Sequence, residues 1–295
     1  MYLFRIHIRP QGGSASVQTI FNYCLSNDLL GVGWQTNTKK NTKNWDEYFG
    51  EASQIHSNLQ SCKYIHKWVS EGDLVWTRDG EANYYLARVI SGWEYWRSAE
   101  GAELDVDIAN IFRCELRRVE LDAVPGKVVA CFRPTRAIQS IADDRVMEYS
   151  KFLWSDLSQK AVYDIDRSQF PDIFSMLDAE ETEDLVFLYL QSLGWYVVPN
   201  SRKADTMRFE FMLVDPKTNK KAATQVKTGD EILNSNTYCQ HPFEKVFLFQ
   251  SNEYYEGPEY DNIVCISRAE LETFLDSAKA WFPASFQKKL DLVRR

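Results

Sequence analysis

The chain has 295 residues, enough for about two domains, and apolar residues make up 44% of it. This apolar share excludes a chain that is disordered throughout. The net charge of −8 is unlike that of a protein that coats nucleic acid without sequence preference, but it leaves room for an enzyme with one basic groove.

The six cysteines are scattered, with no C-x-x-C pair and no zinc-like spacing, so we expect reduced thiols. Arg5, His7 and Arg9 interrupt the first apolar stretch, which is unlike a signal peptide. No run approaches the ~18 apolar residues of a membrane span. We therefore expect a soluble, cytoplasmic protein with no membrane partner.

The first half of the chain has a mostly β pattern. In chain order we expect a strand at 2–8, a helix at 17–25, a tight glycine-hinged segment at 31–34, a polar loop at 36–44 and a helix that ends at Gly72. Strands are then predicted at 74–77, 84–90, from 93, at 111–119 and at 127–132, followed by a short helix at 135–141. This order predicts a small, barrel-like domain over residues 1–150.

The second half has an α/β pattern after a mixed, helical connector at 151–177. Acidic residues at 178–184 begin a helix that runs to Gly194. The helix dipole favours acidic side chains at this N-terminal end. Strands are predicted at 195–198, 209–214, 222–227, 246–249 and 263–266, and a Ser267–Glu270 capping box begins a last helix. The order of helix, three strands, further strands and helix predicts an α/β domain over 178–295.

Four residues of this second domain fit metal-dependent hydrolysis of a phosphodiester. Such chemistry needs oxygen ligands for Mg²⁺ and a cation near the attacking water. Gln225 and Lys227 project from one face of their strand, and the turn at 215–219 brings Glu210 close to Gln225. Glu183, in the first turn of the preceding helix, approaches from the side. Each signal alone is common in ordinary strands and helices, but their order and strand context together favour a catalytic site.

The stretch from Glu181 to about Asp230 resembles the Mrr-like branch of the PD-(D/E)xK nucleases. The resemblance rests on four short matches: Glu183-Asp184-Leu185-Val186, Leu193-Gly194-Trp195, Phe209-Glu210-Phe211 and Gln225-Val226-Lys227.

The resemblance implies a restriction-endonuclease-like fold and a Mg²⁺-dependent DNA endonuclease. Lys227 would orient or activate water, while Glu210 and Gln225, with the Val226 carbonyl, would ligate the metal. Glu183 matches the glutamate on the helix of that family.

The strand carboxylate departs from the family pattern, which usually has aspartate where this chain has Glu210. Asp205, just upstream in a polar loop, is the alternative ligand. We favour Glu210 because it lies within the apolar stretch 209–214.

Aromatic residues follow glycines throughout the first half of the chain. The stretches Gly31–Trp34, Gly72–Trp76 and Tyr84–Gly92 resemble the EVE and PUA-like barrels that read modified bases and occur fused to nucleases in restriction systems. Aromatic rings can hold a flipped base. The predicted base-binding residues are Trp34, Trp76, Tyr85, Trp93 and Trp96.

Core packing is the better explanation for any single tryptophan of this set. Trp34 is the best candidate for a base cage because a polar segment follows it, and Trp93 and Trp96 come next.

The sequence thus predicts a modification-dependent, type IV-like DNA endonuclease of antiphage defence. Its first domain would recognise a modified base, such as a modified cytosine in double-stranded DNA, and a homodimer would supply two active sites. Two alternatives stay open. One is a non-catalytic sensor with a degenerate nuclease fold, and the other is a defence nuclease activated by a small nucleotide signal.

Overall fold

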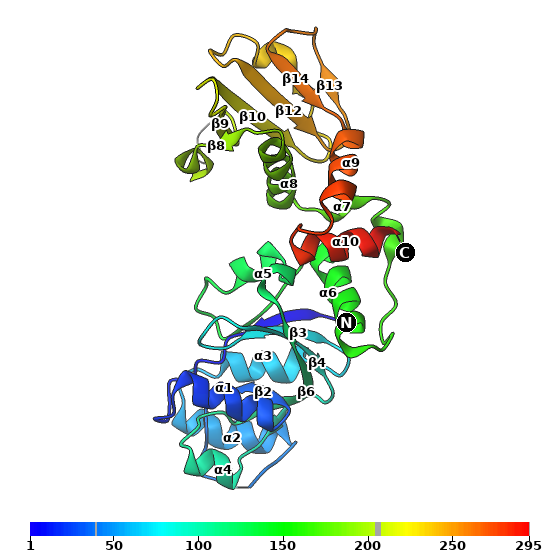
Figure 1. Ribbon diagram of the computed structural model, residues 1–295. Helices are drawn as coiled ribbons and strands as arrows, with labels where there is room; N and C mark the ends of the chain where they lie inside the picture. Colours follow the sequence, from blue (N-terminus) through cyan, green and yellow to red (C-terminus); the bar gives the residue numbers. More distant parts are fainter. Residues whose placement is uncertain (39, 204–207, 295) are drawn as a thin grey trace. The chain divides into compact units, whose positions relative to one another are not determined.

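The chain is a mixed α/β protein in the computed structural model, which describes residues 1–38, 40–203 and 208–294 (Figure 1). It divides into two compact units. The first comprises Met1–Arg167 with Ala284–Lys288, and the second comprises Ser168–Pro283 with Lys289–Arg295. Within the described ranges, no helix has both the length and the apolar character needed to cross a membrane.

The first unit is built on a mixed sheet. Its described strands are β1 (Leu3–Ile6), β2 (Leu29–Val32), β3 (Leu74–Arg78), β4 (Tyr84–Val89), β5 (Glu94–Tyr95), β6 (Asn110–Val119) and β7 (Ile138–Ser140). They are ordered β2-β6-β4-β3-β1-β7, and β5 also pairs with β6. Strand β1 runs parallel to β3 and antiparallel to β7. The predicted strands at 2–8, 74–77, 84–90 and 111–119 are confirmed within a few residues.

Helices cover both faces of this sheet because both faces are apolar. The helices of the unit are α1 (Val17–Ser26), α2 (Trp45–Ile55), α3 (Gln60–Trp68), α4 (Ala99–Glu103), α5 (Gly126–Cys131) and α6 (Asp144–Ser158). Val75 of β3 belongs to the core that α1, α2 and α3 cover. Its neighbour Trp76 points the other way, and its indole Nε1 donates a 3.0 Å hydrogen bond to Ser150 Oγ of α6.

Two predicted elements near the end of this unit were wrong. The predicted strand at 127–132 is helix α5, and the predicted helix at 135–141 contains strand β7. A short apolar run does not distinguish a buried strand from a buried helix. The identity of β7 is set by tertiary structure, since Ile138 pairs with Ile6 and Gln139 with Arg5 along the edge of β1.

The segment at 31–34 is not a hinge, because its first residues lie in β2. Gly31 pairs with Ile111 of β6. A Cβ placed on Gly31 would lie 2.4 Å from the Asn110 carbonyl oxygen, so the close approach of β6 requires glycine here.

The residues predicted as a connector, 151–177, are divided between the two units. Helix α6 lies in the first unit and the short helix α7 (Ile173–Met176) in the second. Asp143 caps α6 through a hydrogen bond from Val146 N, and the helix ends at Gln159, which has a left-handed φ of 57°.

The second unit combines helices with a mixed sheet. Its described elements after α7 are α8 (Ala179–Ser192), β8 (Tyr196–Val197), β9 (Phe211–Val214), β10 (Lys221–Lys227), β11 (Leu233–Asn234), β12 (Lys245–Gln250), β13 (Tyr255–Glu256), β14 (Ile263–Ile266), α9 (Arg268–Ala278) and α10 (Ala284–Arg294), the last of which begins in the first unit. The sheet order is β14-β12-β10-β9-β8. The predicted order of helix, three strands, further strands and helix is confirmed, as is the Ser267–Glu270 capping box.

Helix α8 is positioned by its caps and by one apolar face. Asp178 and Glu181 form a reciprocal capping box at its start. Leu185, Val186 and Leu190 are buried, and Phe187 packs edge-on against Phe211 of β9 with ring centroids 6.0 Å apart. This packing holds the first turns of α8 beside the strand that follows Glu210.

Candidate functional site

The centre of the predicted nuclease site is a pair formed by Glu210 and Gln225. Glu210 lies just before β9 rather than within it, but its backbone N–H still donates a 2.9 Å hydrogen bond to the Thr224 carbonyl of β10. The side chains also meet: Gln225 Nε2 donates to Glu210 Oε1 at 2.7 Å. The prediction that the hairpin brings these two residues together is confirmed.

The Gln225 side chain is buried and half satisfied. Only 4% of the residue is exposed. Its amide nitrogen binds Glu210, while its Oε1 has no hydrogen-bond partner among the described residues. Leaving such an enclosed atom unpaired costs about 1–3 kcal/mol, a cost that a cation bound to this oxygen would remove. Val226, which follows it, is buried and faces the opposite side of β10.

Glu183, on α8, lies within the electric field of Glu210. The pKa of the Glu183 carboxyl is raised to about 7, first by burial and then by the charge of Glu210, while the Arg202 guanidinium opposes both. The two carboxylates therefore repel each other electrostatically, and Glu183 is half-buried. A cation bound between them would offset both the repulsion and the loss of hydration.

Lys227 lies two residues after Gln225 on β10, so the two side chains project from the same face. Its side chain is one-third exposed, and its Nζ lies 3.4 Å from Glu231 Oε2. This ion pair is with an exposed partner, so Lys227 can leave it at little cost.

Tyr238 and Arg208 also belong to this neighbourhood, and the sequence reasoning missed both. Burial raises the pKa of the Tyr238 phenol, the charges of Lys227 and Arg208 lower it, and the charge of Glu210 raises it. Tyr238 packs on Phe209 with ring centroids 5.7 Å apart. It lies in an irregular segment between β11 and β12, where no periodic pattern could have indicated its position.

The donor set here suits a hard cation such as Mg²⁺, since it consists of oxygen atoms alone. Glu183, Glu210, the unpaired Gln225 Oε1 and the Val226 carbonyl are the candidates. Searched over the described residues, the chain has no group of three or more His, Cys, Asp or Glu able to hold a metal. Asp205, the alternative ligand, lies outside the described residues.

The first unit contains a cavity of about 410 Å³ beside Trp34. It opens where β1 and β2 end and where the chain enters β6, and its lining includes His7, Arg9, Gly33, Trp34, His56 and Asp107. Of the five predicted base-binding side chains, all within the described ranges, Trp34 alone lines this cavity.

The other four predicted side chains are engaged elsewhere in the first unit. Trp76 is fully buried, so we leave it out of the proposed base-binding surface. Trp93 is 7% exposed and donates from Nε1 to Asn110 Oδ1 at 3.0 Å. Trp96 stacks on Tyr23 and contacts the Arg113 guanidinium, and Tyr85 packs on Phe21.

Asp107 explains two glycines in the wall of the Trp34 cavity. Burial raises the pKa of its carboxyl, and hydrogen bonds from the backbone N–H groups of Gly12 and Gln35 oppose that shift. A Cβ on Gly12 would lie 2.5 Å from Asp107 Oδ2, and one on Gly33 would lie 2.3 Å from it. Glycine at both positions therefore makes room for the carboxylate, which ties the two loops together.

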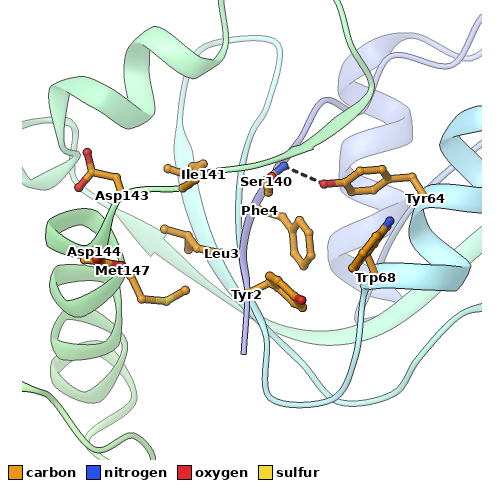
Figure 2. A pocket seen from close by; sticks show the side chains of 11 residues that line it. Tyr2, Leu3, Phe4, Tyr64, Trp68, Ser140, Ile141, Asp143, Asp144 and Met147 are labelled. Carbon is orange, nitrogen blue, oxygen red and sulfur yellow. Dashed lines mark hydrogen bonds between the residues drawn. The ribbon is translucent and has the colours of Figure 1, made fainter.

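A second hollow of about 510 Å³ lies at the paired ends of β1 and β7. Figure 2 shows Tyr2, Phe4, Tyr64 and Trp68 gathered on one side of it, with the Ser140 N–H donating to Tyr64 Oη at 3.1 Å. None of its described lining residues has a buried, unpaired polar side-chain atom. The Trp34 cavity, which has one, is the better candidate for specific recognition.

No known family model, curated protein or solved structure matches the chain.

The Glu183→Gln substitution is expected to stabilise the metal-free protein at pH 8 and to have little effect at pH 4. The pKa of Glu183 is about 7 in the folded chain and near the ordinary value of 4.5 in the unfolded chain. The free energy of unfolding therefore falls as the pH rises from 4.5 to about 7. Glutamine cannot ionise, so the substitution removes this loss of stability. The expected gain in the free energy of unfolding at pH 8 is only on the order of 1 kcal/mol, because solvent screens a half-buried group.

Thermal unfolding in EDTA at both pH values measures this difference. Glu256→Gln, at an exposed position of β13 whose charge is not among the causes of the Glu183 shift, is the control and should show a much smaller difference between pH 4 and pH 8. An equal effect of Glu183→Gln at both pH values would contradict the raised pKa of the Glu183 carboxyl.

Proposed function

We propose that this protein is a modification-dependent DNA endonuclease. The second unit would hydrolyse phosphodiester bonds with Mg²⁺, and the first unit would recognise a modified base. The observation that supports the nuclease most strongly is the Glu210–Gln225 pair. It places a carboxylate beside a buried amide with an unpaired oxygen, and the charge of Glu210 acts on Glu183.

In this proposal, each residue has a chemical role. Glu183, Glu210 and Gln225 would hold the cation, which polarises the phosphate and the attacking water when bound. Lys227 would orient that water and offset the negative charge that grows on the phosphate. Tyr238 and Arg208 would border the scissile strand on the same side.

The first unit would supply specificity through its Trp34 cavity, in keeping with the similarity to EVE and PUA-like readers. A base taken out of double-stranded DNA, such as a modified cytosine, would be stacked against Trp34. A homodimer would place two nuclease sites on one duplex and allow a double-strand break.

A non-catalytic sensor is the second candidate, and one observation favours it. The candidate carboxylate ligands among the described residues are Glu183 and Glu210, and Glu210 accepts a hydrogen bond from the Gln225 amide rather than being free. A degenerate site of this kind would leave binding of modified DNA without cleavage.

A cleavage assay with the full chain distinguishes the candidates. We expect Mg²⁺-dependent breaks in phage DNA that contains modified cytosines, none in the same DNA without modification, and none in EDTA. Modified DNA that binds but stays intact across Mg²⁺ and Mn²⁺ would favour the sensor. Breaks that need an added cyclic nucleotide would instead indicate a nuclease activated by a signal.

A further inference from the structure

The hollow of about 510 Å³ lies at the start of β1, at the opposite end of this strand from the Trp34 cavity. Four aromatic side chains stand on one side of it (Figure 2), namely Tyr2, Phe4, Tyr64 and Trp68. Tyr2 is 48% exposed and Trp68 is 39% exposed, although both are large and apolar. Exposed aromatic residues that gather at one hollow are typical of a binding site.

The four rings meet at steep angles. Tyr2 stands edge-on to Trp68, with ring centroids 6.0 Å apart and an interplanar angle of 83°. Phe4 stands in the same way to Tyr64, at 6.0 Å and 84°. The backbone N–H of Tyr2 donates a 2.7 Å hydrogen bond to the buried Asp73, which fixes this end of the chain. Perpendicular rings enclose a corner rather than a flat stack, so one small cation there can contact two rings.

The lining of this hollow carries negative charge. It includes Asp143 and Asp144 at the start of α6, and its described residues include no lysine, arginine or histidine. Figure 2 shows both aspartates on the side opposite the rings. Asp143 caps α6 by accepting the Val146 N–H at 3.2 Å, whereas Asp144 is exposed. Two carboxylates without a cationic residue in the described wall favour a positively charged ligand.

Trp68 already attracts a cation of the chain itself. The Lys67 Nζ lies 4.7 Å from the centroid of the Trp68 ring. This contact occupies one face of the ring. Lys67 is exposed and is not among the described lining residues, so the hollow is left to another cation.

The type of cation follows from the hydrogen bonds of the wall. None of the described lining residues has an enclosed, unpaired polar side-chain atom, and Tyr64 Oη already accepts the Ser140 N–H. A primary ammonium has three N–H groups that each need an acceptor. A quaternary ammonium has none, and aromatic rings recognise it by its charge alone. Directed hydrogen bonds therefore do not define the ligand of this hollow.

We propose that this hollow binds a small quaternary ammonium ligand. Its charged head would lie against Tyr2 and Trp68, and its apolar body along Leu3 and Ile141, in a space whose volume suits a small molecule. This inference does not depend on the proposed nuclease or on the Trp34 cavity, and it stands if either fails. The sequence did not indicate the site, because Tyr2 and Trp68 meet only through the pairing of β1 with β3, which follows α3.

Calorimetric titration of the full chain with choline tests the proposal. The reference compound is 3,3-dimethyl-1-butanol, which has the shape of choline but a carbon atom in place of the charged nitrogen. Choline is expected to bind about 10-fold more tightly than this alcohol, because the rings attract its charge. High salt should reduce the difference, since it screens the aspartates. Ethanolamine, a primary amine, should bind more weakly than choline.

Substitutions in the wall identify the site. Trp68→Ala is expected to weaken choline binding about 10-fold, and Trp68→Phe should restore part of it, because a ring face is kept. Asp144→Asn should weaken choline binding about 3-fold and leave the alcohol unaffected, since it removes an exposed charge. Tyr196→Ala, at an exposed tyrosine of β8 in the second unit, is the control and should bind as the wild type does. Thermal unfolding of each variant establishes that it is folded.

Three results would overturn the proposal. Equal binding of choline and the alcohol would show a hollow that takes apolar groups without regard to charge. Unchanged choline binding by folded Trp68→Ala and Tyr2→Ala would place the ligand elsewhere on the chain. Absence of saturable choline binding by the wild type would exclude the site altogether.

Discussion

Replacing Lys227 by alanine is expected to lower the rate of cleavage of modified DNA on the order of 10²- to 10³-fold, the usual effect of removing one group that stabilises transition-state charge. Lys227 projects from the same face of β10 as Gln225, and its ion pair is with an exposed residue, Glu231. Its ammonium is therefore free to turn toward a bound phosphate. Single-turnover cleavage with excess enzyme measures the chemical step without product release.

Lys221→Ala is the matched control for this substitution. Lys221 lies at the other end of the same strand and is exposed. Its side chain is identical to that of Lys227, but it lies away from Glu210. It should cleave within about 3-fold of the wild type, because an exposed charge contributes little. Lys227→Ala is also expected to bind modified DNA normally in EDTA. A wild-type cleavage rate for this variant would rule out Lys227 as part of the catalytic centre.

The proximity of Glu210 and Gln225 could be predicted because it depends on local sequence. The turn at 215–219 joins two neighbouring strands, so the register of the hairpin follows from its loop. The structure has that register, with Lys221 paired to Val214 and Thr224 to Phe211. The contribution of Tyr238 depends on how an irregular segment folds back over the sheet, and no local pattern encodes that.

The first unit shows why its aromatic residues could not be assigned from sequence. Trp34 comes directly after Gly33 and Trp76 four residues after Gly72, yet Trp76 is in the core and Trp34 lines a cavity. Both faces of the sheet are covered by helices, so the alternation in β3 does not reveal an exposed side. The difference between these tryptophans arises from α6, a helix of 15 residues that lies across the predicted boundary at residue 150.

The cavity itself is a product of long-range pairing. His7, Gly33 and Asp107 are far apart in the sequence, and they meet because β1, β2 and β6 belong to one sheet. The Gly-Val-Gly-Trp motif did indicate the place, but the reason for its second glycine is the Asp107 carboxylate rather than a stacked ring. The sequence pattern thus indicated the part of the cavity wall that contains Gly33 and Trp34. That Asp107 lies in the same wall follows only from the fold.

Glu210→Gln is expected to abolish most cleavage, by more than the roughly 10- to 100-fold that loss of an outer partner of a metal ligand costs. The substitution is nearly isosteric, and the new amide oxygen can still accept the 2.7 Å hydrogen bond from Gln225 Nε2. It therefore removes the charge that would hold Mg²⁺ while leaving the hairpin in place. Titration of cleavage against Mg²⁺ concentration should show a higher requirement for the metal as well as a lower maximal rate.

The same experiment with Asp205→Asn decides which carboxylate is the metal ligand. If Glu210 is the ligand, Asp205→Asn should cleave within a few-fold of the wild type at the same Mg²⁺ concentration. Loss of cleavage in Asp205→Asn together with full activity in Glu210→Gln would reverse the assignment. Glu210→Gln should also bring the pKa of the Glu183 carboxyl closer to its usual range, since the Glu210 charge is among the causes that raise it. Stability should then fall less with rising pH than in the wild type, and unchanged pH dependence would show that Glu183 and Glu210 do not share one site.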